Sequence, residues 1–255
     1  SFIPGETLKK QTVTGAGIDM SLVLTKKITL YSQFAQLMLN KDDGAGGSVS
    51  KLSEAFPEAL EATTYHSPLG WGAIPIGVGF SFGPDKFKLS TNLEYRMNSR
   101  HFMFGFWDQG YELTRSTVLP PTDIETKADR LLNYGELKGF YFGTNISMFN
   151  FLNLDISYQQ MEGEVWNDPA SENYDDTHVV AEGAFSADGY FKTGEENNSL
   201  LGKLSFNVSK IPKLKIAELY YERTNDTNFN LKEPSVNTIH GYNLGYEFSE
   251  GVILL

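Results

Sequence analysis

Residues 152–159 read LNLDISYQ and alternate apolar with polar side chains at every step. Successive side chains of a β-strand point to opposite faces of its sheet, so a period of two predicts a strand with one apolar and one polar face. The same alternation recurs at 87–97, 140–148, 203–209 and 242–248. The sequence therefore predicts an all-β fold built from antiparallel strands.

The expected strands are long. Most run for about 10–14 residues, whereas strands of ordinary globular proteins average about 5–6 and a tilted strand of 9–11 residues crosses a bilayer. The alternation is less regular in 28–40, where apolar residues fall on both faces, and around Ala217 and Glu218. We expect nine strands, at 13–24, 28–40, 70–82, 87–98, 136–148, 151–163, 199–209, 214–224 and 237–248.

Short and long connections alternate between these strands. Turns of a few residues join them at 25–27, 83–86, 149–150 and 210–213, and several of these turns carry lysine. Long polar connections separate the resulting hairpins at roughly 41–68, 99–135, 164–198 and 225–235. The connection 164–198 holds nine acidic residues and one lysine. Short turns at one rim and long loops at the other are typical of transmembrane β-barrels.

With these features the chain resembles the porin-like outer-membrane β-barrel proteins of Gram-negative bacteria. The resemblance is one of architecture over nearly the whole chain. It implies an antiparallel up-and-down transmembrane β-barrel with short periplasmic turns and long extracellular loops. It also implies a place in the bacterial outer membrane, with membrane lipid as a partner and with other outer-membrane proteins or a second copy as further candidates.

The strand count bears on whether the barrel is whole. Residues 249–251 look like another short turn and 252–255 like the start of a tenth strand. Single-chain bacterial barrels have even strand numbers and close by pairing the last strand with the first. We expect one barrel domain over 1–255, with 1–11 as an N-terminal extension, that is a fragment lacking its C-terminal strands. A very short tenth strand is the alternative.

Composition excludes several other classes. The chain of 255 residues has no cysteine, which excludes a disulfide framework, a Cys-based zinc site and a thiol nucleophile. Its formal net charge of −11 argues against nucleic acid as a partner, because phosphate contacts need clustered Lys and Arg. No stretch approaches the 18 apolar residues that indicate a transmembrane helix. A soluble β-sandwich or β-solenoid remains the structural alternative.

A polar wall would line the lumen of such a barrel. Two functions are expected: a porin-like channel or transport component for small solutes, or a non-conducting anchor or subunit of an outer-membrane complex that binds a partner through its long acidic loops. A barrel of eight to ten strands is largely filled by its own side chains, whereas open pores need roughly 16 strands. The residues expected to face the lumen are Asn92, Glu94, Asn153, Asp155, Gln159, Lys203, Asn207, Asn243 and Glu247.

No catalytic residues are expected. Residues 79–83 match the G-x-S-x-G pattern of hydrolases, but Ser81 lies inside an alternating strand and no helix follows. Four scattered histidines, at 66, 101, 178 and 240, lack the spacing of a zinc-binding helix. The remaining catalytic alternative is an activity like that of outer-membrane phospholipases, with His240 paired to a serine.

Three further features are candidates for binding. No cofactor is expected except calcium, for which the acidic loop supplies carboxylate oxygens from Asp168, Glu172, Asp175 and Asp176. The aromatic run at 102–107 offers exposed contacts for a partner, a ligand or a sugar, or extends the barrel wall. Residues 51–62 carry helical spacing. Aromatic residues near strand ends suit interfacial girdles, namely Tyr31, Trp71, Tyr95, Phe149, Phe151, Tyr158, Tyr220, Tyr221 and Phe248.

Overall fold

The structure is a computed structural model, and the account below concerns only the residues that it describes. These are residues 13–40, 66–84, 86–106, 116–119, 123–149, 151–167, 191–208, 211, 213–226, 229–230, 232–233, 238–249 and 252–254. Two expectations concern residues outside these ranges: the helix at 51–62, and the calcium ligands Asp168, Glu172, Asp175 and Asp176.

One antiparallel sheet dominates the described chain. Its ten strands follow one another in sequence order, with the separate two-stranded hairpin β5–β6 inserted between the fourth and fifth of them. The prediction of an all-β, up-and-down fold is confirmed. The strands are β1 (Val13–Thr25), β2 (Ile28–Asn40), β3 (His66–Phe82), β4 (Phe87–Asn98), β7 (Leu137–Met148), β8 (Leu152–Trp166), β9 (Phe191–Phe206), β10 (Leu214–Asp226), β11 (Thr238–Ser249) and β12 (Val252–Leu254).

Most strand bounds lie close to those expected from the sequence, and the exceptions are at the loop ends. Strand β9 begins at Phe191, inside the expected connection 164–198, because its first residues pair with the end of β8. The expected connection 99–135 also contains structure. It holds β5 (Ser116–Leu119), β6 (Asp123–Thr126) and the short 3₁₀-helix η1 (Asp129–Asn133), none of which the alternation predicted.

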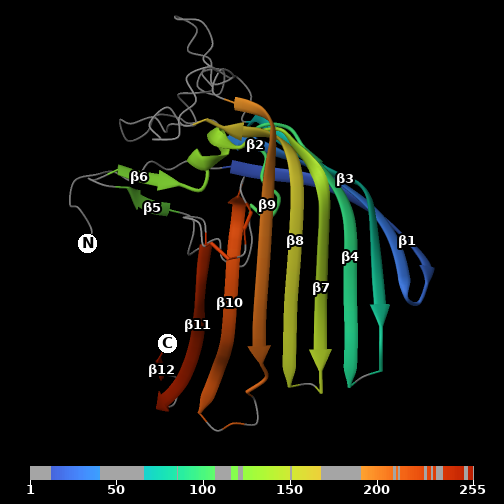
Figure 1. Ribbon diagram of the computed structural model, residues 1–255, viewed down its shortest axis with the longest axis vertical. Helices are drawn as coiled ribbons and strands as arrows, with labels where there is room; N and C mark the ends of the chain where they lie inside the picture. Colours follow the sequence, from blue (N-terminus) through green and yellow to red (C-terminus); the bar gives the residue numbers. More distant parts are fainter. Residues whose placement is uncertain are drawn as a thin grey trace, which may run out of the picture.

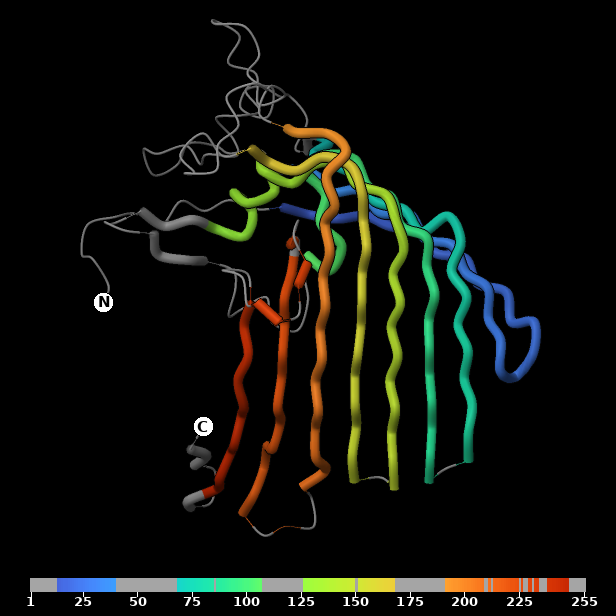
Figure 2. The backbone as a smooth tube through the Cα atoms, viewed as in Figure 1, coloured from blue at the N-terminus to red at the C-terminus, as the bar shows by residue number. Residues whose placement is uncertain are grey.

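The connections separate by length at the two ends of the sheet. In Figure 1 the ends at which β3 meets β4, β7 meets β8 and β9 meets β10 through short connections lie at the bottom, while η1 and β5–β6 lie toward the top, which we call the loop end and where the strands bend over. The tube in Figure 2 shows how strongly the sheet curves, since β1 and β2 cross the view while β7–β11 run vertically. In the described part of the chain the sheet is open, with β1 and β12 as its two edges.

The cross-strand register sorts side chains onto two faces. We call one the apolar face; its members include Leu93 on β4, Phe142 on β7, which pairs with Leu93, and Tyr158 on β8, which pairs with Phe142. The opposite face is the polar face, where Glu94 pairs with Tyr141 and Tyr141 with Gln159. Because partners in an antiparallel pair point the same way, each face continues across the sheet.

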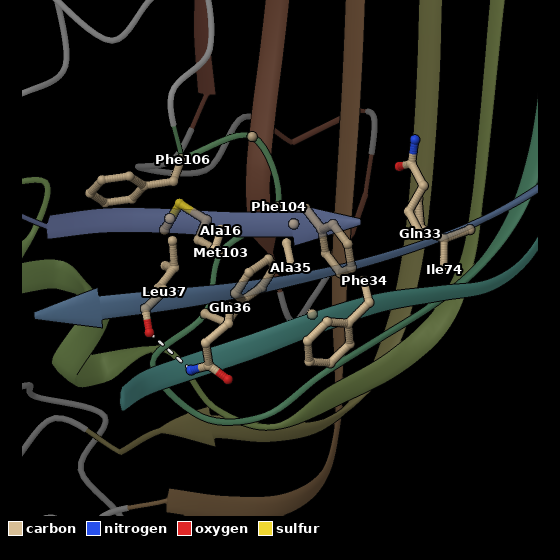
Figure 3. A pocket seen from close by; sticks show the side chains of 15 residues that line it. Ala16, Gln33, Phe34, Ala35, Gln36, Leu37, Ile74, Met103, Phe104 and Phe106 are labelled. Carbon is tan, nitrogen blue, oxygen red and sulfur yellow. Dashed lines mark hydrogen bonds between the residues drawn. The ribbon is translucent and has the colours of Figure 1, made fainter. Parts of the chain in front are cut away.

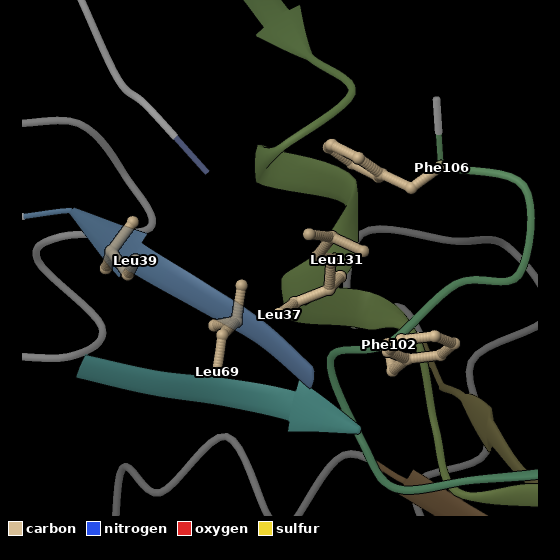
Figure 4. Close-up of a cluster of buried hydrophobic side chains, with 6 residues drawn as sticks. All are labelled: Leu37, Leu39, Leu69, Phe102, Phe106 and Leu131. Atoms are coloured by element: carbon tan, nitrogen blue, oxygen red, sulfur yellow. The ribbon is translucent and has the colours of Figure 1, made fainter. Parts of the chain in front are cut away.

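The largest buried cluster lies at the loop end of the polar face. It joins strands β2 and β3 to the segment after β4 and to η1 (Figure 4), and comprises Leu37, Leu39, Leu69, Phe102, Phe106 and Leu131. Two of these leucines are the apolar residues that break the alternation of 28–40. The register places Leu37 and Leu39 on the polar face, where the returning segment covers them and removes them from water.

The second irregular segment also has a local cause. Between Leu214 and Ile216 the register of β10 against β11 shifts, as it does at a β-bulge. A bulge adds one residue to one strand and so reverses the face that the next side chains occupy. The broken alternation in this part of the sequence reflects that extra residue.

Candidate functional site

The register brings eight of the nine residues expected to face a lumen onto the polar face. Asn92 and Glu94 lie there on β4, and their neighbours across the sheet place the rest. The set on β8, β9 and β11 comprises Asn153, Asp155, Gln159, Lys203, Asn243 and Glu247. The ninth, Asn207, follows the end of β9, and its backbone N–H donates to the carbonyl of Phe151.

Charged and amide groups on this face bond from strand to strand. Asn145 Nδ2 donates to Asp155 Oδ1 over 2.6 Å between β7 and β8. Lys203 and Glu218 form an ion pair at 3.0 Å between β9 and β10. Polar groups removed from water need such partners, so these bonds let a hydrophilic surface line the sheet without isolated charges.

The densest part of the polar face is a row across five strands, which we call the Arg96 cluster. Tyr31 on β2 donates from its hydroxyl to Glu94 Oε1 over 2.6 Å. Arg96 donates from Nε to Glu94 Oε2 over 2.7 Å and from Nη1 to Gln159 Oε1 over 2.9 Å. Its guanidinium carbon lies 3.5 Å from the centre of the Tyr141 ring. Glu94 is only 5% exposed, so its carboxylate oxygens take their hydrogen bonds from these donors rather than from bulk water.

Glycine allows the tyrosine rings of the cluster to lie flat. A Cβ atom built on Gly77 would lie 2.4 Å from a ring carbon of Tyr31, so any side chain at position 77 would displace the ring. Gly77 occupies β3 between Tyr31 on β2 and Glu94 on β4, and the ring crosses that strand to reach the carboxylate. Rings laid over cross-strand glycines are a known way to stabilise a curved sheet.

The apolar face carries a band of exposed hydrophobic side chains. On β4 the band runs from Phe87 to Tyr95, nine residues or about 27 Å at about 3.4 Å per residue. On β7 it runs from Met148 to Phe140 and ends at Lys138. Within it the hydroxyls of Thr91 and Thr144 lie 3.0 Å apart and bond to one another. Among the described residues, more large hydrophobic side chains are exposed than buried, and the exposed ones include Ile18, Met20, Leu22, Phe34, Ile76, Phe87, Leu93, Phe140, Phe142, Leu219 and Leu244.

Aromatic rings mark both edges of this band. Near the turns Phe151 contacts Phe206 at 5.7 Å between ring centres. At the other edge Tyr95 contacts Phe140 at 5.3 Å, and Phe34 stacks on Trp71. Rings at both edges of an outward apolar band are the pattern of membrane barrels.

The aromatic residues expected to form an interfacial girdle divide between the two faces. Trp71, Tyr95, Tyr158 and Tyr221 lie on the apolar face, whereas Tyr31 and Tyr220 face the polar side, and their assignment to a girdle was wrong. Register, which depends on the neighbouring strands, decides the face. The side chain of Phe248 lies outside the described residues.

The aromatic run after β4 does not form an exposed patch. Phe102 and Phe106 are 4% and 3% exposed, so they are not free contacts for a partner, and they do not extend the wall. Instead the segment turns back and packs on the polar face, where the Phe102 ring fills the space that a side chain at Gly72 would need. Trp107 lies outside the described residues.

The remaining candidates are dispersed. Ser81 is an exposed residue of β3. His101 bonds through Nδ1 to the carbonyl oxygen of Leu131 at 2.9 Å, and His240 is exposed on the apolar face opposite Tyr221. Among the described residues no three histidine, aspartate or glutamate side chains lie close enough to hold a metal ion.

One ion pair at the loop end was not expected from the sequence. Arg100, after β4, donates to both carboxylate oxygens of Glu164 on β8 over 2.7 Å. These hydrogen bonds, with one from the backbone N–H of Glu136, hold the pKa of Glu164 below its usual range, although burial opposes the shift. Glu164 lies beyond the apolar band, so the ion pair joins the segment after β4 to the loop end of β8.

Comparison with known proteins finds no match: no family model, no curated protein and no solved structure matches the chain. In the described chain no helix is long and apolar enough to cross a membrane. The functional argument therefore depends on the two faces of the sheet.

Proposed function

We propose that the chain forms the wall of an outer-membrane β-barrel that passes small solutes, with the apolar face against lipid and the polar face toward an aqueous lumen. The observation that carries the proposal is the exposed apolar band with aromatic rings at both edges. A soluble sheet would need to cover such a band, because large exposed apolar patches favour association.

The dimensions of the band support a bilayer. The nine residues from Phe87 to Tyr95 fall in the range of about 9–11 that a tilted transmembrane strand needs. The pairing of Thr91 with Thr144 within the band satisfies their hydroxyls without water, as hydrocarbon surroundings require. Lys138 and Glu162, which pair across β7 and β8, follow the band at the loop end, where strands would enter water.

The opposite face supports an aqueous lumen. Charged and polar side chains predominate on it over β4, β7, β8, β9 and β10, with Leu201 and Ile216 among the apolar exceptions, and the polar groups bond along the sheet. An anchor with a packed interior would also tolerate this polarity. A non-conducting anchor is therefore the second candidate, favoured by the covering of the polar face by Phe102 and Phe106 at the loop end.

Two measurements test the proposal. The purified protein should need detergent or lipid to stay monodisperse, and solubility in buffer alone would contradict the membrane assignment. In planar bilayers a channel gives stepwise conductance, whereas an anchor gives none.

The conducting surface can then be identified by charge reversal. Asp155→Lys on the polar face should shift the reversal potential under a salt gradient toward anion preference, because it changes a lumen charge by two units. Leu154→Ala, the adjacent residue on the apolar face, is the matched control and should leave the reversal potential unchanged. Equal effects of both variants would contradict the assignment of the faces.

A further inference from the structure

A pocket lies between the polar face of β1–β3 and the segment that returns after β4. Its cavity volume is about 360 Å³. Figure 3 shows Met103, Phe104 and Phe106 on one side of it and the strands that carry Ala35 and Leu37 on the other. The volume falls in the range of about 300–1,000 Å³ typical of small-molecule sites.

The lining of this pocket differs from the rest of the polar face. Its floor includes residues with little or no side chain, such as Gly15, Gly17 and Ala35, and its polar side chains are the neutral amides of Gln33 and Gln36. Its roof is aromatic and sulfur-bearing, with Phe104 and Met103. None of the residues that line it is Asp, Glu, Lys or Arg, although the Arg96 cluster is its neighbour. An uncharged hollow in a charged wall favours an apolar occupant.

Contacts within the protein hold the roof in place. Phe102 and Phe106 are buried on either side of it, and the Phe102 ring occupies the space above Gly72. Phe104 contacts Phe102 edge to face at 5.2 Å. Because these anchors are contacts within the protein itself, an occupant need not supply the free energy to form the site.

The neighbouring charge limits what can bind. The guanidinium of Arg96 lies 5.0 Å from the centre of the Phe104 ring, but Glu94 and Gln159 already accept its hydrogen bonds. A carboxylate on the occupant would have to compete with Glu94 for this cation. The pocket therefore suits a neutral molecule better than an anion.

We propose that this pocket binds a small neutral aromatic solute of about two rings. A cavity of about 150 Å³ accommodates benzene, so 360 Å³ has room for a second ring. The roof phenylalanines offer ring edges and the Met103 sulfur adds a favourable contact. Entry from the aqueous side rests on the proposed function, in which the polar face borders the lumen; binding itself does not require conduction.

Benzophenone tests the proposal directly, because it is neutral, has two rings and couples covalently to nearby C–H groups on illumination. The detergent-purified full chain is irradiated with it, and labelled peptides are mapped by mass spectrometry. We expect the label on 102–106 and 33–37. Label spread over apolar-face peptides such as 87–95 and 140–148, without enrichment at 102–106, would overturn the proposal.

Two comparisons sharpen the test. Ala35→Leu fills the floor and should lower labelling of 102–106 about tenfold, the effect of about 1.4 kcal/mol in affinity. Gly202→Leu is the matched control, since a Cβ there meets no atom within 4 Å and lies on the apolar face, and it should change nothing. Labelling of 102–106 that survives Ala35→Leu unchanged would contradict the site.

The unaltered protein supplies a measurement that does not depend on folding of a variant. Naphthalene added before illumination should compete with benzophenone and lower its labelling of 102–106, whereas 2-naphthoate should not. An equal decrease in labelling with both competitors would contradict the preference for a neutral solute. If labelling succeeds but bilayers show no conductance, the site stands and the channel fails. If conductance is seen without labelling at 102–106, the site fails alone.

Discussion

The guanidinium carbon of Arg96 lies 3.5 Å from the centre of the Tyr141 ring, on the face of the sheet that also carries Glu94. The cation is thus held by a ring below it and by carboxylate and amide oxygens at its edge. Arginine suits this position because its planar group stacks and donates hydrogen bonds at the same time. The arrangement links β4, β7 and β8 through one side chain.

Removing this cation should strongly destabilise the sheet. We predict that Arg96→Met lowers the free energy of unfolding by about 3 kcal/mol, because it leaves the buried Glu94 carboxylate without its positive partner. Denaturant unfolding in detergent, followed by circular dichroism, measures the loss. The double variant Glu94→Gln with Arg96→Met should recover part of it, since the buried charge is then gone.

An exposed ion pair provides the comparison. Lys215 and Glu247 lie 2.9 Å apart with their side chains 46% and 27% exposed. Lys215→Met should change the free energy of unfolding by no more than about 1 kcal/mol, because solvent screens the pair. Equal losses for Arg96→Met and Lys215→Met would show that the cluster has no special role.

The apolar face permits a test that separates membrane from water. Leu93 is 48% exposed and lies within the band, two residues from its midpoint at Thr91. In a bilayer Leu93→Arg should cost about 2–4 kcal/mol, as arginine does near the midplane of membrane barrels. On a soluble sheet an exposed substitution changes stability by about 0.5 kcal/mol or less. Reversible unfolding from lipid vesicles distinguishes the two, with Asn92→Arg on the polar face as the control.

The sequence predicted the strands better than it predicted what covers them. Alternation in 152–159 depends only on the local chain, and β8 lies where it indicated. The return of Phe102 and Phe106 onto the polar face depends on contacts with distant strands, so no local period reports it. A signal was present in β2, where Leu37 and Leu39 lie on the polar side. Such leucines indicate a covering segment.

The Arg96 cluster was also only partly predictable. Glu94 and Gln159 stand at polar positions of alternating strands, and the register brings both to one face. The Tyr31 ring reaches Glu94 only because Gly77, on the strand between them, has no side chain to block it. The partner of that glycine is set by strand pairing, which one sequence does not reveal. The same holds for Arg100 and Glu164, which are 64 residues apart.

Acid should weaken the loop end of the sheet through Glu164. Its folded pKa lies below the value of about 4.3 expected in the unfolded chain. A carboxyl with a lowered pKa stabilises the fold fully above the unfolded value and loses that contribution as the pH falls through the folded pKa. The free energy of unfolding should therefore begin to fall as the pH drops through the unfolded value and should continue to fall until the pH has passed the lower folded pKa.

The variant Glu164→Gln should show a smaller decrease over this range, measured by denaturant unfolding at each pH. Arg100→Met should reduce the pH dependence in the same way, because Arg100 is the main cause of the lowered pKa. The double variant should add nothing further, as expected for two groups that act through one interaction. Additive effects of the two substitutions would show that they act separately.

The docking of the returning segment on β3 can be tested at one glycine. A Cβ atom on Gly72 would lie 2.1 Å from the ring of Phe102, whose burial leaves it little room to move. Gly72→Ala should therefore cost about 1–3 kcal/mol, the usual effect of overpacking. Gly202→Ala, which meets no atom within 4 Å, should be near neutral in the same unfolding measurement. Adding Phe102→Leu to Gly72→Ala should restore part of the loss, because the smaller side chain can vacate the space. If the two glycine variants were equally stable, the segment would not pack on the polar face, and the roof of the pocket would be absent.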